Sequence, residues 1–126
     1  MAFKEKLQLP SSRRLSEPTR GNIMIYEIAV LPVYKHQVER FREAFAEVVP
    51  LLRRAKGYLG HVLAQGIETP EHFNLIVRWQ TLEDHTPGFE ASEDHRVFML
   101  ALEEYFCGEP TVHHLEGNDF SLPDDL

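Results

Sequence analysis

The sequence predicts one α+β domain of ferredoxin-like order, β-α-β-β-α-β, built on an antiparallel sheet. Segments rich in β-branched and aromatic residues alternate in this order with segments whose apolar residues recur every three or four positions. The 126 residues are enough for one such domain and too few for two ordinary ones.

The predicted sheet has one face that its own helices cannot cover. Two helices cover one face of four strands, whereas the third strand carries large apolar side chains such as Ile76 on the other face. A symmetric dimer in which two sheets meet would bury this second face. We therefore expect a homodimer that closes an α+β barrel.

The first half of the domain is predicted to be strand, helix, strand. Residues 22–33 (NIMIYEIAVLPV) predict a strand with Glu27 as a polar residue inside it. Residues 35–54 predict a helix of about five turns, in which Pro50 should introduce a kink or loosen the end. The apolar face of this helix is expected to consist of Val38, Phe41, Phe45, Val48 and Leu52. Gly57 should stop the helix before a second strand at residues 58–65.

The second half is predicted to be strand, helix, strand. Residues 73–80 (FNLIVRWQ) predict a third strand that forms a hairpin with the second. Thr81 and Asp84 resemble a capping box for one short helical turn. Ser92 is expected to cap the second helix, which runs to about residue 106. A last strand is predicted at residues 111–116.

Charge is unevenly distributed along the chain, whose net charge is −7. Residues 1–20 carry +3, the domain at residues 21–116 carries −7, and the tail at residues 117–126 carries −3. An acidic body does not favour nucleic acid, which needs a basic face. The first 20 residues are expected to form a flexible arm, or alternatively to reach over a partner subunit.

The sequence favours a cytoplasmic protein without a membrane segment. No stretch approaches the roughly 20 apolar residues that cross a bilayer. The first residues contain no apolar run of the kind that secretory signals have. Cys107 is the single cysteine, so it cannot form an intrachain disulfide, which fits a reducing compartment.

A characteristic series of residues begins at the end of the third predicted strand. Trp79 ends this strand, and a helix with aromatic residues at its end and a last strand with Val112 and His114 come later. Between them lie Leu82-Glu83-Asp84-His85, Gly88-Phe89, Ser92 and His95. Over residues 22–116 the chain resembles the antibiotic biosynthesis monooxygenase-type domain of the dimeric α+β barrel superfamily.

This resemblance implies a homodimer with a cavity in each subunit, between the sheet and the second helix. Some members of the family oxidise phenols, quinols or anthrones with O2 and no cofactor, whereas related barrels degrade haem or have no known activity. We therefore expect a cofactor-independent monooxygenase that acts on a small aromatic or quinoid compound. The alternatives are a non-catalytic dimeric barrel that binds a hydrophobic small molecule, and a haem-degrading relative.

Cofactor-free oxygenation needs a base, donors that hold a developing oxyanion, and a dry apolar cavity. His85 and His95 are the candidate bases, because the pKa of histidine suits proton transfer near neutral pH. Trp79 is the third catalytic candidate, since it could line the pocket and donate a hydrogen bond to a bound aromatic. Alternatively, the two histidines stabilise a local turn and a helix start, and Trp79 packs in the core.

Four further residues are candidates for substrate binding: Asn74, Arg78, His61 and Phe89. Asn74 and Arg78 are polar residues inside a strand, and they could hold an anion or form a polar network between subunits. No metal site is predicted, because no histidine spacing matches a zinc signature. His113 and His114 must point to opposite faces of the last strand, and the sequence does not say which faces the cavity.

Overall fold

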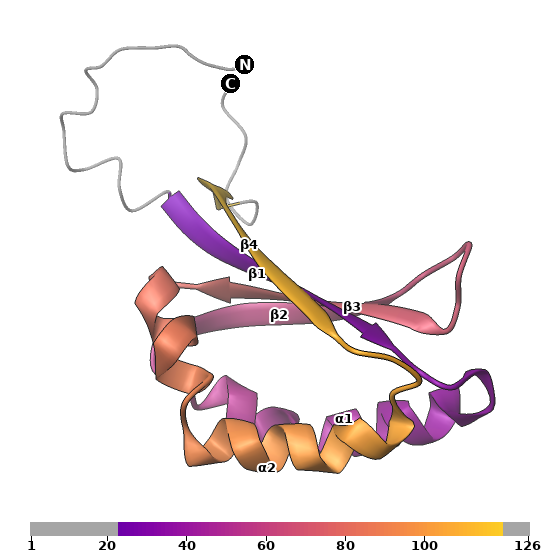
Figure 1. The fold of residues 1–126 in the computed structure, drawn as a ribbon. Helices are drawn as coiled ribbons and strands as arrows, with labels where there is room; N and C mark the ends of the chain where they lie inside the picture. The colour runs from indigo at the N-terminus through magenta and orange to yellow at the C-terminus, as the bar shows by residue number, and fades with distance from the viewer. Residues whose placement is uncertain (1–22, 120–126) are drawn as a thin grey trace, which may run out of the picture. The chain divides into compact units, whose positions relative to one another are not determined.

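A four-stranded sheet with two helices on one of its faces forms the domain (Figure 1). The computed structural model describes residues 23–119, of which residues 25–115 form one compact unit. The strands are β1 (Ile23–Pro32), β2 (Tyr58–Gln65), β3 (His72–Trp79) and β4 (Thr111–Asn118). The helical elements are η3 (Lys35–Gln37), α1 (Val38–Arg53), η4 (Asp84–Phe89), α2 (Glu93–Leu102) and η5 (Glu103–Tyr105). The predicted fold class and element order are confirmed.

The strands lie in the order β2-β3-β1-β4, so the two strands of the predicted hairpin are neighbours. β3 pairs antiparallel with both β1 and β2. The register places Glu27 opposite Val77, in the middle of the sheet. The carboxyl group of Glu27 therefore lies among apolar side chains. An acidic residue is rarely buried at such a position without a partner.

The core lies between the sheet and the two helices. On β3 the four alternating residues Phe73, Leu75, Val77 and Trp79 are all buried. On α1 the buried residues are Phe41, Phe45, Val49 and Leu52. Val49 is buried in place of Val48, which was predicted for this face and is only half-buried; both side chains pack against the core.

The helix ends differ from the prediction by a few residues. The first turn of the predicted first helix is a separate short turn, η3, and α1 continues past Pro50 to Arg53. The second helix ends at Leu102, and η5 replaces its predicted last turn because the chain tightens before the extended residue Phe106. At the other end of α2, Ser92 caps the helix as predicted by accepting the His95 amide N–H at 3.1 Å.

The chain ends were assigned to an arm and a tail. The arm at residues 1–20 lies outside the described residues. β4 extends through Asn118, so it includes the first residues of the predicted tail at 117–126, and the rest of that tail from residue 120 also lies outside them. Among residues 23–119, no helix has the length and apolar character needed to cross a membrane.

Candidate functional site

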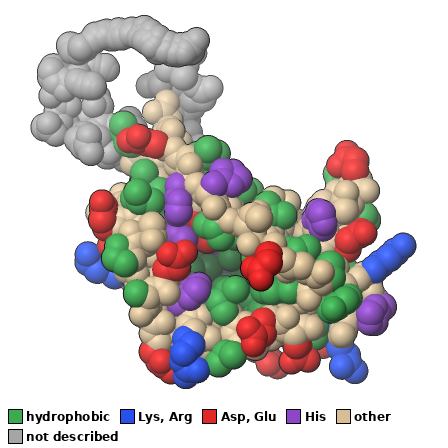
Figure 2. All heavy atoms as spheres, in the orientation of Figure 1, with side chains coloured by type: hydrophobic (Ala, Val, Ile, Leu, Met, Phe, Trp, Pro, Cys, Tyr) green, Lys and Arg blue, Asp and Glu red, His purple; other side chains and the backbone are tan. Residues whose placement is uncertain are grey.

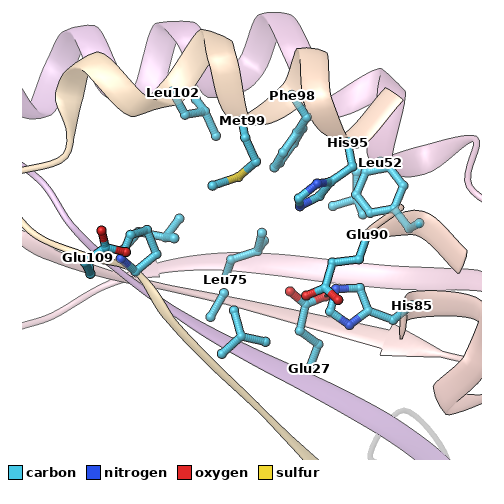
Figure 3. Close-up of a pocket in the computed structure, with 15 residues that line it drawn as sticks. Glu27, Leu52, Leu75, His85, Glu90, His95, Phe98, Met99, Leu102 and Glu109 are labelled. Atoms are coloured by element: carbon cyan, nitrogen blue, oxygen red, sulfur yellow. The ribbon is translucent and has the colours of Figure 1, made fainter. Parts of the chain in front are cut away.

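A cavity of about 240 Å³ lies between the sheet and α2 (Figure 3). In the space-filling view, hydrophobic side chains form the floor of a hollow with acidic and histidine side chains around it (Figure 2). The cavity is lined by Glu27, Ala29, Leu31, Leu52, Leu75, His85, Phe89, Glu90, His95, Phe98, Met99, Leu102, Glu109, Pro110 and Val112. An apolar cavity with a few convergent polar groups is the usual form of a small-molecule site.

The turn η4 brings His85 to the cavity. Asp84, at the start of this turn, donates its amide N–H to the Thr81 hydroxyl at 3.1 Å, which is the cap predicted from the sequence. Its buried carboxylate accepts from Lys56 at 3.2 Å. Gly57 makes room for this carboxylate: it has φ +83°, and a Cβ there would lie 2.1 Å from Asp84 Oδ2. The fixed Asp84 places His85 in the interior, where it is 2% exposed.

Glu27, His85 and Trp79 form a buried polar cluster at one end of the cavity. Trp79 donates its indole N–H to Glu27 Oε1 at 2.9 Å, and His85 Nε2 lies 3.3 Å from the same oxygen. The imidazole of His85 stacks on the Trp79 ring with a centroid distance of 5.2 Å and an angle of 23°. The indole therefore fixes both the carboxyl group and the imidazole plane.

His114 extends this cluster toward the surface. His85 Nδ1 lies 2.8 Å from His114 Nε2, and His114 is half-buried. Two arrangements of the protons satisfy the contacts among Glu27, His85 and His114. In one, His114 donates to His85 and His85 donates to the Glu27 carboxylate; in the other, protonated Glu27 donates to His85 and His85 donates to His114. The three side chains can thus pass a proton between the cavity and the half-buried edge of β4.

Burial changes the pKa values of the two central groups in opposite directions. It raises the pKa of Glu27 from its ordinary value of 4.5 to about 7, against the opposing effect of the Trp79 hydrogen bond. It also lowers the pKa of His85 from 6.5 to about 4. Both shifts favour the uncharged form, which a low-dielectric site stabilises. At neutral pH His85 is therefore neutral, and Glu27 is divided between its acid and its carboxylate.

Glu90 and His95 complete the polar end of the cavity. Figure 3 shows the Glu90 carboxylate beside that of Glu27 and close to His85. Its negative charge raises the pKa of Glu27, and it also raises those of His85 and His95 against the larger lowering by burial. His95 projects from the first turn of α2 with its ring edge-on to Phe89, at a centroid distance of 5.3 Å.

The structure brings four of the predicted site residues together. His85, His95 and Phe89 line the cavity, and Trp79 is fully buried behind His85. Of the two histidines left open on the last strand, His114 points inward to His85, whereas His113 is exposed.

The other three predicted site residues lie away from the cavity. Asn74 and Arg78 are on the face of β3 that alternates with the buried one, and Arg78 donates to the Leu59 carbonyl at 3.1 Å. His61 lies on the helix side of β2, where Tyr58 Oη is 2.7 Å from its Nδ1 and Phe45 meets its ring edge-on. Burial lowers the pKa of His61, and the positive charge of Arg53 lowers it further.

Glu27 and His114 were not predicted as site residues. An acidic residue in the middle of an apolar strand was the sequence feature that could have identified Glu27, because such a residue must find a buried partner. Within residues 23–119, no set of three or more His, Cys, Asp or Glu side chains is arranged to hold a metal ion.

The sequence of this chain is similar to those of known proteins. Residues 24–100 match the family model described as antibiotic biosynthesis monooxygenase. The chain is also 33% identical over 93 residues to an uncharacterized protein of Bacillus subtilis, YczJ; the match covers 74% of this chain and 98% of that protein.

Solved structures show the same fold. A Bordetella bronchiseptica protein named for the same monooxygenases has a TM-score of 0.70 and 35% sequence identity, with 73% of this chain and 94% of that one covered. A Caulobacter crescentus protein named likewise has a TM-score of 0.67 with 78% and 92% coverage. At 14% identity, the second likeness concerns the fold alone.

Proposed function

This chain belongs to the antibiotic biosynthesis monooxygenase family, and we propose that it oxidises a small aromatic or quinoid compound with O2 and without a cofactor. The observation that carries this proposal is the buried Glu27–His85 pair at one end of an otherwise largely apolar cavity. Such a pair supplies a proton acceptor that works near neutral pH, and both of its side chains are buried from water.

The proposed reaction converts the CH2 group of an anthrone-like substrate to a carbonyl. Glu27 removes one proton, and the resulting delocalised anion gives one electron to O2. The two radicals combine to form a C–O bond, and the peroxide takes up a proton. Loss of the second C–H proton then breaks the O–O bond. One O2 is consumed, one oxygen atom stays in the product, and the other leaves as water, so no external reductant is needed.

Glu27 rather than a histidine is the proposed base. A base acts best when its pKa lies near the working pH, and the pKa of Glu27 is about 7 whereas that of His85 is about 4. His85 is then the group that orients the carboxylate and passes its proton on to His114. Trp79 holds the carboxyl group through its N–H, and His95 and Phe89 would contact the substrate ring.

A homodimer is part of the proposal. On the sheet face away from the helices, Ile28, Ile76 and Val62 lie in register across β1, β3 and β2, and Val62 is 46% exposed. A second copy packed on this apolar row would cover it. Analytical ultracentrifugation of Val62→Glu should then show a monomer, whereas Leu100→Glu, a matched change on an exposed residue of α2, should leave the dimer intact. A wild-type monomer would contradict this part of the proposal.

Oxygen uptake by the metal-stripped protein with a panel of quinols and anthrones tests the proposed reaction. We expect uptake that saturates with substrate and exceeds that of heat-denatured protein. Glu27→Gln should lower kcat by about 10²- to 10⁴-fold, which is the usual contribution of a positioned base. Glu103→Gln removes an exposed carboxylate of η5 and is the matched control.

Two outcomes would count against the proposal. Saturable binding of the same compounds without oxygen uptake would instead favour a barrel that binds a hydrophobic molecule and does not transform it. Uptake that Glu27→Gln leaves intact would remove Glu27 from the role of base. In that case His85→Ala and His95→Ala, with His36→Ala as an exposed control, would show which histidine accepts the proton.

A further inference from the structure

We infer that the cavity accepts uncharged or cationic ligands and rejects carboxylates, and that Glu90 is the residue that imposes this selection. The inference refines the substrate class of the proposed function, on which it rests for the aromatic nature of the ligand. It can be tested by binding alone, so it does not depend on turnover.

The charged residues around the cavity are of one sign. Among the described residues that line it, the side chains that carry a full charge when ionised at neutral pH are Glu27, Glu90 and Glu109. The described residues that line the cavity include neither lysine nor arginine. An anionic group that enters the cavity therefore meets carboxylates without a cation to pair with, and an unpaired charge is costly to bury.

The carboxylates lie at both ends of the cavity. Glu90 and Glu27 are together at the end next to His85, whereas Glu109 is at the opposite end, beyond the apolar floor formed by Leu75 (Figure 3). A ligand that fills the cavity therefore brings either of its ends close to an acidic side chain. Turning the ligand around does not remove the repulsion.

The two histidines of the lining do not offset these carboxylates. Burial lowers the pKa of both His85 and His95, so both imidazoles are neutral at neutral pH. The charge of Glu90 raises the pKa of Glu27, His85 and His95 alike, which means that its field acts on each of the other titratable groups at this end. The same field would act on a bound anion.

Three described cations pair with acidic residues that do not line the cavity. Arg54 makes two hydrogen bonds of 2.7 Å to Asp94, Lys56 pairs with Asp84, and Arg96 pairs with Glu93. In Figure 2 the lysine and arginine side chains of this face lie at its edges and not around the hollow. None of these three cations lines the cavity to attract a carboxylate.

Calorimetric titration with three matched compounds tests the inference: 2-hydroxynaphthalene, its carboxylate derivative and its aminomethyl derivative. At about pH 8 and low salt, we expect the neutral and ammonium compounds to bind at least about tenfold more tightly than the carboxylate, because like charges repel strongly where screening is weak. Glu90→Gln should reduce this difference in affinity severalfold, and Glu103→Gln should leave it unchanged. Glu90 is exposed, so its replacement should not prevent folding.

Equal affinity of the wild-type protein for the carboxylate and the neutral compound would overturn the inference, and so would a failure of all three to bind. A preserved difference in Glu90→Gln would remove Glu90 as its cause; Glu109→Gln then tests the other end of the cavity. Selective binding without any oxygen uptake would leave this inference standing and defeat the proposed oxygenation, so the two failures are distinguishable.

Discussion

In the proposed reaction, Glu27 and His85 act as a proton-transfer pair. Glu27 and His85 lie next to each other in a buried position, and each favours its neutral form. The carboxyl group becomes a base that ionises near neutral pH, whereas the imidazole stays neutral and can both donate and accept. Trp79 limits the rise in the Glu27 pKa through its hydrogen bond, and Glu90 increases it through its charge.

The pH dependence of kcat/KM should reflect these two neighbours of Glu27. In the wild-type protein we expect kcat/KM to rise through about pH 7 as Glu27 loses its proton. Trp79→Phe removes the N–H that stabilises the carboxylate, so the midpoint should move to higher pH. Glu90→Gln removes a repelling charge, so the midpoint should move to lower pH.

The measurement is a set of kcat/KM profiles between about pH 5 and about pH 9. A structural role of Trp79 alone would reduce the rate without moving the midpoint. Midpoints that stay together in all three proteins would contradict the assignment of Glu27 as the titrating base.

Among the elements, the turn η4 determines where the site forms. It follows the end of β3 and carries both His85 and Phe89 into the interior. Its first residue, Asp84, packs against Gly57 at the start of the hairpin, and the Gly57 carbonyl accepts the Gln80 amide N–H at 2.8 Å. The position of η4 therefore depends on a close approach between two loops.

Gly57→Ala should disturb this close approach. An alanine at φ +83° is strained by about 1 to 2 kcal/mol, and its Cβ would overlap the Asp84 carboxylate. We expect the free energy of unfolding to fall by at least about 1 kcal/mol. The oxygen uptake of the protein that remains folded should also fall, because His85 follows Asp84 directly. Urea denaturation and activity of the folded protein measure the two effects.

The matched control is Gly108→Ala, where the nearest atom to the new Cβ is Pro32 Cγ at 3.5 Å, an ordinary contact. This variant should unfold at nearly the wild-type urea concentration. A Gly57→Ala protein as stable and active as the control would show that η4 does not depend on this glycine.

The elements were predictable from the sequence where local patterns decide them. Alternation along β3 indicated which of its side chains are buried, and the Ser92 cap indicated where α2 begins. The polar cluster was not predictable in this way. It joins Glu27 to Trp79 across 52 positions and His85 to His114 across 29, through strand pairing and an irregular turn that no local period determines. Sequence patterns therefore indicated His85 as a candidate but not its partners.

At the scale of the whole molecule, Glu27 should make stability depend on pH. Its pKa is higher in the folded protein (about 7) than its ordinary value of 4.5, so the folded state binds the proton more tightly. Stability then falls as the pH rises from about 4.5 to about 7, and stays lower above that. At about 1.4 kcal/mol per pKa unit the loss is about 3 kcal/mol. His85 acts in the opposite sense, because its lowered pKa costs stability as the pH falls from 6.5 toward 4.

Glu27→Gln should remove the loss of stability that the wild-type protein shows above about pH 4.5. The glutamine Oε1 can still accept from Trp79 and from a neutral His85 that carries its proton on Nε2, and the side chain carries no charge. We expect the variant to match the wild-type protein near pH 4 and to be more stable by up to about 3 kcal/mol near pH 8. Urea denaturation at the two pH values measures this difference. A variant less stable than the wild type at pH 8 would show that Glu27 is not held there at the expense of stability.

The most direct test of the proposed oxygenation is the origin of the oxygen atom in the product. The metal-stripped wild-type protein is incubated with an anthrone that it binds, under an atmosphere of ¹⁸O2. The mass of the quinone product is then measured by mass spectrometry. We predict one ¹⁸O atom in the new carbonyl group and formation well above that of heat-denatured protein and of Glu27→Gln. A product whose new oxygen comes from water, or one that forms no faster than in the denatured blank, would contradict the proposed reaction.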